Sequence, residues 1–123
     1  MLFRSGYTVA VSDIDPARSF LQEFLGAEVV YETARPAVGA HGVGLQIADA
    51  VLELIAPVTE GALQRHIQRF GEGIRSTVFG VRDIEQARRY FTERGVDLEP
   101  GAAQNTLAVP PEHNLGIMFE FSE

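Results

Sequence analysis

Two glutamates stand alone inside apolar segments and are the first candidates for chemistry. Glu53 interrupts the apolar run at residues 51–55, and Glu120 interrupts the run at 118–121. An ionised carboxylate in such surroundings is costly unless it meets a cation, binds a metal ion or holds a proton through a raised pKa. Glu53 and Glu120 are therefore the candidate catalytic residues. The alternative is that one or both reach solvent at a strand end.

Other side chains are weaker candidates for chemistry. The absence of cysteine excludes disulfides, thiolate nucleophiles and zinc sites built on sulfur. The three histidines, His41, His66 and His113, are too widely separated for the i, i+4 spacing that places two ligands on one helix face. We therefore expect loop or surface positions for them. His41 and His113 precede strands expected to border a cleft, which makes them candidates for ligand binding. No Gly-x-Ser-x-Gly nucleophile motif is present.

Composition limits the class of protein. With 123 residues, 46% of them hydrophobic and 22% charged, the chain can form one domain with a real core. The net charge of -7 and the lack of a basic cluster argue against a nucleic-acid partner. No apolar run approaches the length of a membrane span, and the N-terminus lacks a secretory signal pattern. We expect a soluble, cytoplasmic protein with no membrane partner.

An internal repeat organises the chain. Residues 9–23 recur 70 positions later as residues 79–93, and the segment 51–54 recurs as 118–121, which relates Glu53 to Glu120. The first stretch holds six identical pairs, namely Val11/Val81, Asp13/Asp83, Ile14/Ile84, Ala17/Ala87, Arg18/Arg88 and Glu23/Glu93. We infer a single domain, 1–123, of two modules at about 1–58 and 72–123, joined by a linker helix at about 59–71. The alternative is a common strand-to-helix pattern that occurs twice.

Each module begins with an alternating strand and continues into a helix. Asp13 and Asp83 supply the side-chain oxygen that a helix N-cap needs, and Gly26 and Gly95 follow as stop signals. Further strands are predicted from alternation and turn residues at 28–33, 42–48 and 50–55, then weakly at 98–99, and at 106–109 and 116–121. This pattern predicts an α+β fold of two βαβββ modules in tandem.

Strand alternation then predicts an open cleft. Side chains of a strand point alternately to the two faces of a sheet, so one face packs on the helices and the other stays open. Both glutamates fall on the open face, whereas alternation points Arg75 away from it. The sequence assigns no role to Arg35. The expected ligand-binding residues are Thr8, His41, Val51, Ser76, Val78, His113 and Met118.

The chain resembles a known superfamily. The segment Asp-Ile-x-x-Ala-Arg at 13–18, the strand Leu-Glu-Leu-Ile-Ala-Pro at 52–57 and the stretch at 73–84 look like the vicinal oxygen chelate (glyoxalase, bleomycin resistance, dioxygenase) superfamily. Within it they are closest to methylmalonyl-CoA epimerases. The likeness spans nearly the whole chain and implies a glyoxalase-like fold. It also implies a divalent metal, held by a residue at the start of the first strand and one in the last strand of each module.

Carried over to this chain, the metal positions are Gly6, Glu53, Ser76 and Glu120. The repeat pairs Gly6 with Ser76 and Glu53 with Glu120, which supports the register. Both positions usually held by histidine are therefore vacant, and two carboxylates alone are a poor site for a transition metal. We expect no metal and no cofactor, with a divalent metal at Glu53 and Glu120 as the alternative. The epimerase resemblance also expects an acidic base just before His41, where this chain has Ala40.

These observations lead to a functional hypothesis. We expect a small-molecule binding protein of the glyoxalase/bleomycin-resistance type with a degraded metal site, whose ligand is a small, partly apolar organic molecule. The resemblance implies a homodimer. The alternative is a divergent isomerase or lyase that transfers a proton next to a carbonyl, with Glu53 or Glu120 as base. A third, weaker alternative is a regulatory or assembly subunit.

Overall fold

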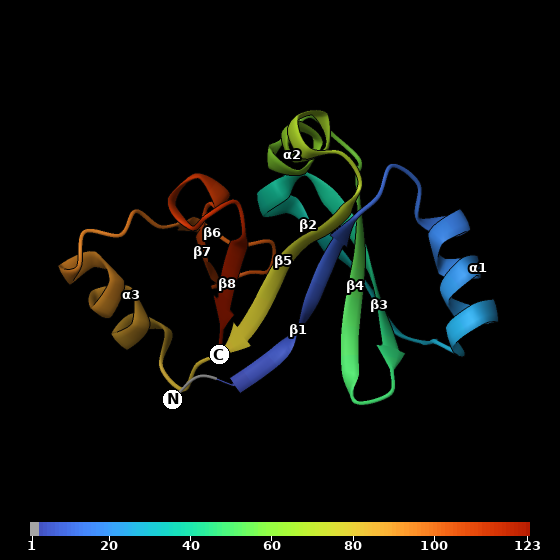
Figure 1. Cartoon of the computed structure of the whole chain (residues 1–123), viewed down its shortest axis with the longest axis horizontal. Helices are drawn as coiled ribbons and strands as arrows, with labels where there is room; N and C mark the ends of the chain where they lie inside the picture. The colour runs from blue at the N-terminus through green and yellow to red at the C-terminus, as the bar shows by residue number, and fades with distance from the viewer. Residues whose placement is uncertain (1–2) are drawn as a thin grey trace.

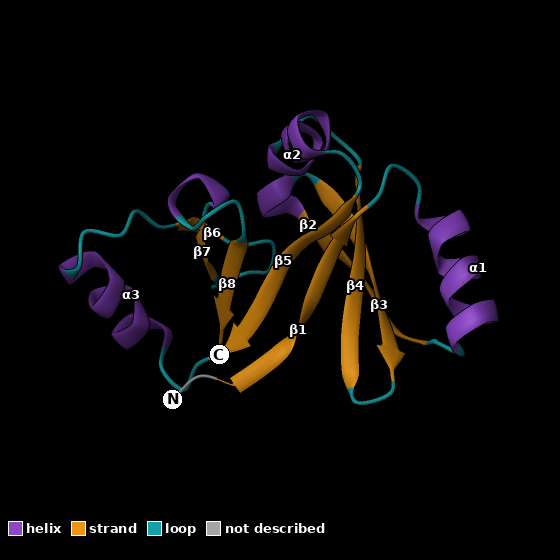
Figure 2. Ribbon diagram, in the orientation of Figure 1, coloured by secondary structure: helices purple, strands orange, loops and turns teal. Residues whose placement is uncertain are grey.

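The computed structural model describes residues 3–123, and for residues 3–5 and His113 it describes the backbone alone. The strands form one curled eight-stranded sheet in the order β2-β3-β4-β1-β5-β8-β7-β6 (Figure 1). Helices α1 and α3 lie at opposite ends of the molecule, and α2 lies above its middle (Figure 2). The predicted α+β fold of two βαβββ modules is confirmed.

The elements follow the predicted order. The first module contains β1 (Phe3–Ala10), α1 (Ile14–Leu25), β2 (Glu28–Arg35), a 3-10 turn (Pro36–Val38), β3 (Ala40–Ile47) and β4 (Ala50–Pro57). The linker forms α2 (Ala62–Phe70). The second module contains β5 (Gly73–Gly80), α3 (Ile84–Glu93), β6 (Glu99–Pro100), β7 (Leu107–Val109), a 3-10 turn (Pro111–His113) and β8 (Met118–Ser122). The last strand begins two residues later than predicted, because a turn with Gly116 at φ 84° precedes it.

Strand pairing reproduces the repeat. In each module the first strand pairs in parallel with the last, as β1 with β4 and β5 with β8, and β1 joins β5 in antiparallel orientation. Thr8 lies opposite Glu53 in the first module, and Val78 lies opposite Glu120 in the second. Because Thr8 and Val78 are 70 positions apart, the two glutamates occupy equivalent places in the sheet.

Helix ends and helix faces match the sequence pattern. The carboxylate of Asp13 accepts a hydrogen bond from the backbone N–H of Asp15, and Gly26 ends α1 in the left-handed region at φ 64°. Apolar residues of α1 and α3 pack on one face of the sheet, α1 against β3 and β4, and α3 against β7 and β8. The opposite face is left for a cleft.

The linker helix closes one end of that opposite face. Leu63 of α2 is fully buried in a cluster with Ala10 and Ile55, which point away from α1. The cluster also contains Ala40 and Val38, so the chain entering β3 is held beneath the same helix. Among the described residues, no helix is long and apolar enough to cross a membrane.

Candidate functional site

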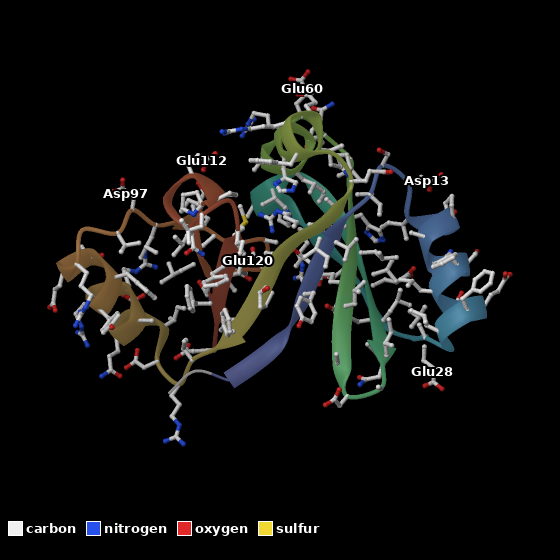
Figure 3. All side chains as sticks on the ribbon, viewed as in Figure 1. Asp13, Glu28, Glu60, Asp97, Glu112 and Glu120 are labelled. Atoms are coloured by element: carbon white, nitrogen blue, oxygen red, sulfur yellow. The ribbon has the colours of Figure 1, made fainter. Side chains whose placement is uncertain are left out.

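A cleft of about 310 Å³ lies on the sheet face opposite α1 and α3. Its walls combine apolar side chains with both carboxylates that the sequence singled out. The lining includes Thr8, Tyr31, Arg35, Val51, Glu53, Val78, Ala102, Thr106 and Glu120. Figure 3 shows Glu120 in the interior of the second module, whereas labelled acids such as Asp13, Glu28 and Glu60 project from the surface.

Two side chains of β2 donate hydrogen bonds to Glu53, and one of them, Arg35, neutralises its charge. Glu53 is only 6% exposed. Arg35 donates from Nε to Glu53 Oε2 at 2.9 Å and from Nη2 to Oε1 at 2.6 Å, and Tyr31 donates its hydroxyl to Oε1 at 2.5 Å. Burial and the hydrogen bond to Glu53 raise the pKa of Tyr31, and the hydrogen bond to Glu53 raises the pKa of Arg35. The site therefore holds a neutral phenol and an ionised guanidinium.

β3 lies between β2 and β4, and two of its glycines allow the side chains of β2 to reach Glu53 on β4. A Cβ on Gly42 would stand 2.9 Å from Glu53 Oε2, and a Cβ on Gly44 would overlap the ring of Tyr31. Without side chains at these positions, Tyr31 and Arg35 reach across β3 to Glu53. Both glycines lie within the strand that the sequence predicts at 42–48.

Glu120 is held by a different set of donors. It is 3% exposed and accepts bonds on Oε1 from Arg75 Nη1 at 3.1 Å and from the backbone N–H of Ala102 at 2.8 Å. Ser76 donates its hydroxyl to Oε2 at 2.6 Å and shares a second hydrogen bond of 2.5 Å with the hydroxyl of Thr8. This second bond links the modules across the β1–β5 contact.

The predicted orientation of Arg75 is wrong. The β1–β5 register passes from Thr8 opposite Ser76 to Val9 opposite Ile74, so Arg75 is an extra residue on β5. Such a β-bulge interrupts the two-residue alternation on which the prediction depended. Arg75 and Ser76 therefore both reach Glu120. A matching bulge in the backbone of β1 lies at Ser5, 70 positions earlier.

The other expected residues are only partly brought together. Thr8, Val51 and Val78 line the cleft with both glutamates. Ser76 and Met118 are buried but do not line it. His41 is exposed and is not a lining residue, since it alternates with the cleft-facing Gly42, and the side chain of His113 lies outside the described part of the structure.

Sequence reasoning missed several lining residues. Tyr31 and Arg35 are four residues apart in an extended strand and so lie on the same face, a pattern that could have paired them. Their acidic partner, Glu53, lies two strands away, and no sequence pattern near either residue predicts that contact. The loop at residues 101–106, which supplies Ala102, Ala103 and Thr106, was also missed.

The four metal positions implied by the resemblance do not fit a divalent ion. Gly6 has no side chain, and an added Cβ would overlap the carbonyl oxygen of Val51, so an imidazole there requires the backbone to move. Glu53 and Glu120 are each engaged by an arginine. Within residues 3–123 as described, no group of three or more His, Cys, Asp or Glu residues could hold a metal.

The geometry also bears on proton transfer. A general base needs a free acceptor within reach of the ligand. Every oxygen of Glu53 and Glu120 already accepts at least one hydrogen bond from the protein. Ala40, at the position where the resemblance expects a base, is 2% exposed in an apolar cluster with Ile55 and Leu63.

The family follows from a direct match. Residues 5–109 match the model of the Glyoxalase/Bleomycin resistance protein/Dioxygenase superfamily. This chain belongs to that superfamily. The match covers both modules as far as β7, so the duplicated fold and the family assignment agree.

Individual relatives add detail about the fold. The uncharacterized protein YwkD of Bacillus subtilis (strain 168) is 27% identical over 103 residues, covering 81% of this chain and 79% of that protein. The crystal structure of hypothetical protein BH1468 from Bacillus halodurans C-125 is 26% identical, with a TM-score of 0.86 over 98% of this chain and 92% of the other. Methylmalonyl-CoA epimerase from Mycobacterium tuberculosis is 23% identical, with a TM-score of 0.83 over 96% and 85%. The epimerase likeness shows a shared fold.

Proposed function

We propose that this member of the superfamily binds a small, partly apolar organic molecule in its cleft without a metal ion. One observation carries the proposal, namely that each carboxylate at a metal position pairs with an arginine of its own module. Arg35 lies 2.6 Å from Glu53, and Arg75 lies 3.1 Å from Glu120. Two arginines supply the two positive charges that one divalent ion would bring, so the acids have no uncompensated charge to offer a metal.

The cleft itself supports a binding role. Its volume of about 310 Å³ suits a small molecule, at the lower end of the ~300–1,000 Å³ that is usual for ligand sites. Val51, Val78 and Ala102 supply apolar wall, and Thr8 and Thr106 supply hydroxyls. A mostly apolar wall with a few polar groups is the usual composition of a site that orients a small organic ligand.

The isomerase or lyase alternative receives less support. Proton transfer needs a base within hydrogen-bond reach of the substrate. The position that the epimerase resemblance assigns to the base holds Ala40, and both cleft carboxylates are committed to arginines. A binding protein that uses the fold for its shape requires neither a base nor a metal.

Metal analysis of the purified protein tests the proposal directly. We expect no stoichiometric metal by elemental analysis, and no change in melting temperature with micromolar Mn²⁺, Co²⁺, Ni²⁺ or Zn²⁺. The control is the double variant Glu53→Gln/Glu120→Gln, which removes both acidic donors. A bound metal, or a melting shift present in the wild type and absent from this variant, would contradict the metal-free proposal. A fragment screen by NMR should then place small organic ligands at Val51 and Val78.

A further inference from the structure

The hydrogen-bond acceptors and donors of the cleft differ in how far they are already occupied. Both oxygens of Glu53 accept hydrogen bonds from Arg35, and one of them also accepts the hydroxyl of Tyr31. The oxygens of Glu120 are similarly engaged by Arg75, Ser76 and the backbone of Ala102. The acids therefore have little capacity left for a ligand that donates hydrogen bonds.

The arginines keep unused donors. Nε and Nη2 of Arg35 donate to Glu53, and the guanidinium also interacts with the hydroxyl of Tyr31, whereas no hydrogen bond from Nη1 is seen among the described residues. A guanidinium has donors on all three nitrogens and no acceptor. The charged hydrogen-bonding capacity that remains in the cleft is thus on the donor side, and a ligand must supply the acceptors.

Only one of the two arginines is accessible to a ligand. Arg35 lines the cleft and its side chain is 19% exposed, whereas the side chain of Arg75 is 3% exposed and does not line it. Glu53 holds two nitrogens of Arg35 in a planar fork, which restricts the direction in which the third nitrogen points. Arg35 is therefore an oriented cation on the cleft wall.

We propose that the ligand of this cleft carries a carboxylate and that Arg35 anchors it through Nη1. This inference rests on the proposed binding function and names the class of ligand. A carboxylate supplies acceptor oxygens for the remaining donors of Arg35 and brings a single negative charge, whereas a doubly charged group such as a phosphate meets stronger repulsion from the carboxylate of Glu53. The apolar body of the ligand lies against Val51 and Val78, which line the same cleft.

Three probes of one shape and different charge test the anchor, namely benzoate, benzamide and benzamidine, which are anionic, neutral and cationic. Binding is measured by two-dimensional NMR titration of the ¹⁵N-labelled protein, following the backbone signals of Val51 and Val78 and the Nε signal of Arg35. We expect benzoate to bind about tenfold or more tightly than benzamide, since an ion pair with the guanidinium replaces a hydrogen bond from it to a neutral acceptor. Benzamidine should bind weakest.

Two variants change the affinity for benzoate in opposite directions. Arg35→Met removes the anchor and should abolish the preference for benzoate over benzamide. Glu53→Gln removes the competing carboxylate and should raise the affinity for benzoate. Arg88→Met is the matched control, because Arg88 pairs with Glu85 on the exposed face of α3 and lies outside the cleft lining. Glu53→Gln keeps the test informative if Arg35→Met fails to fold.

The outcomes distinguish a failure of the carboxylate anchor from a failure of the proposed binding function. If all three probes bind the cleft equally in the wild type, the carboxylate anchor is wrong and the binding function stands. If benzamidine binds best, or if Glu53→Gln leaves the affinity for benzoate unchanged, the anchor is also wrong. If none of the probes shifts the signals of Val51 and Val78, both the anchor and the proposed apolar binding site are overturned.

Discussion

The two modules place a glutamate at the same point of the sheet and neutralise it in different ways. Glu53 lies opposite Thr8, and Glu120 lies opposite the equivalent Val78. The cation for Glu53 comes from β2, two strands away, whereas the cation for Glu120 comes from a bulge in the adjacent strand β5. The equivalent carboxylates have thus acquired unrelated partners.

The cause lies in the second strand of each module. β2 has eight residues and carries both Tyr31 and Arg35, whereas its counterpart β6 has two, Glu99 and Pro100. β6 is too short to bear both equivalent side chains, and the loop that follows it gives Glu120 a backbone N–H from Ala102 instead. A duplicated fold preserves the position of an acid, while the segments that diverged decide what neutralises it.

The difference in exposure separates structural and binding roles. The Arg75–Glu120 pair is almost fully buried, at 3% and 4% side-chain exposure, while Arg35 is 19% exposed beside Glu53 at 7%. Nε of Arg75 is also buried without a hydrogen-bond partner among the described residues. We assign the inner pair to stability and the outer pair to the ligand, and the predictions below test that division.

The largest effect is expected for Arg75→Met. Removing one partner of a buried pair leaves an uncompensated charge, so the free energy of unfolding should fall by about 3–5 kcal/mol. Urea denaturation followed by circular dichroism measures it. The control is Arg75→Met/Glu120→Met, which removes both charges and should recover most of the loss. A double variant as unstable as the single one would contradict a charge-based effect.

Arg35→Met should have a smaller effect, about 1.5–3 kcal/mol, because the variant loses two charge-assisted hydrogen bonds at a site that solvent partly reaches. Tyr31 continues to donate to Glu53 in the variant. The same urea experiment applies, with Arg88→Met as a surface control expected within about 0.5 kcal/mol of the wild type. An equal loss of unfolding free energy for Arg35→Met and Arg75→Met would contradict the assignment of one pair to stability and the other to the ligand.

Tyr31→Phe should lower stability by about 1 kcal/mol near neutral pH, through loss of one hydrogen bond to Glu53. Because the folded-state pKa of Tyr31 is raised above its ordinary value of 10.0, the contribution is present below pH 10 and is lost as pH rises above it. The chain contains no lysine, so few other groups titrate there. Denaturation midpoints from pH 9 to 11.5 should fall more steeply for the wild type than for the variant.

A parallel slope for the two proteins would show that Tyr31 does not hold its proton through Glu53. Tyr90→Phe is the matched control, since Tyr90 is 51% exposed on α3. This variant should retain the alkaline slope of the wild type.

The smallest effect compares the two helix caps. Asp83 accepts hydrogen bonds from the N–H groups of Glu85 and Gln86, whereas Asp13 accepts one, from Asp15. Asp83→Ala should therefore cost about 1 kcal/mol of unfolding free energy, and Asp13→Ala less. Thermal melting of the two variants side by side measures the difference. A greater loss for Asp13→Ala would show that capping does not follow the number of bonds.

Local patterns in the sequence determined the fold and the place of the two acids. Alternation and helix caps are properties of neighbouring residues, and the 70-residue repeat can be read directly along the chain. Together they predicted the modules, the order of elements along each module and the shared face of Glu53 and Glu120. These predictions held because side-chain direction follows the backbone conformation of each residue.

The partners of the acids were decided by tertiary structure alone. Arg35 reaches Glu53 across β3, which pairs with both of their strands and has Gly42 and Gly44 on the cleft face. No spacing of residues within one strand predicts that contact. Arg75 meets Glu120 because a bulge in β5 shifts its side chain, and a bulge is set by the register against the neighbouring strand. Contacts between distant strands depend on how the whole sheet pairs, which a single strand cannot encode.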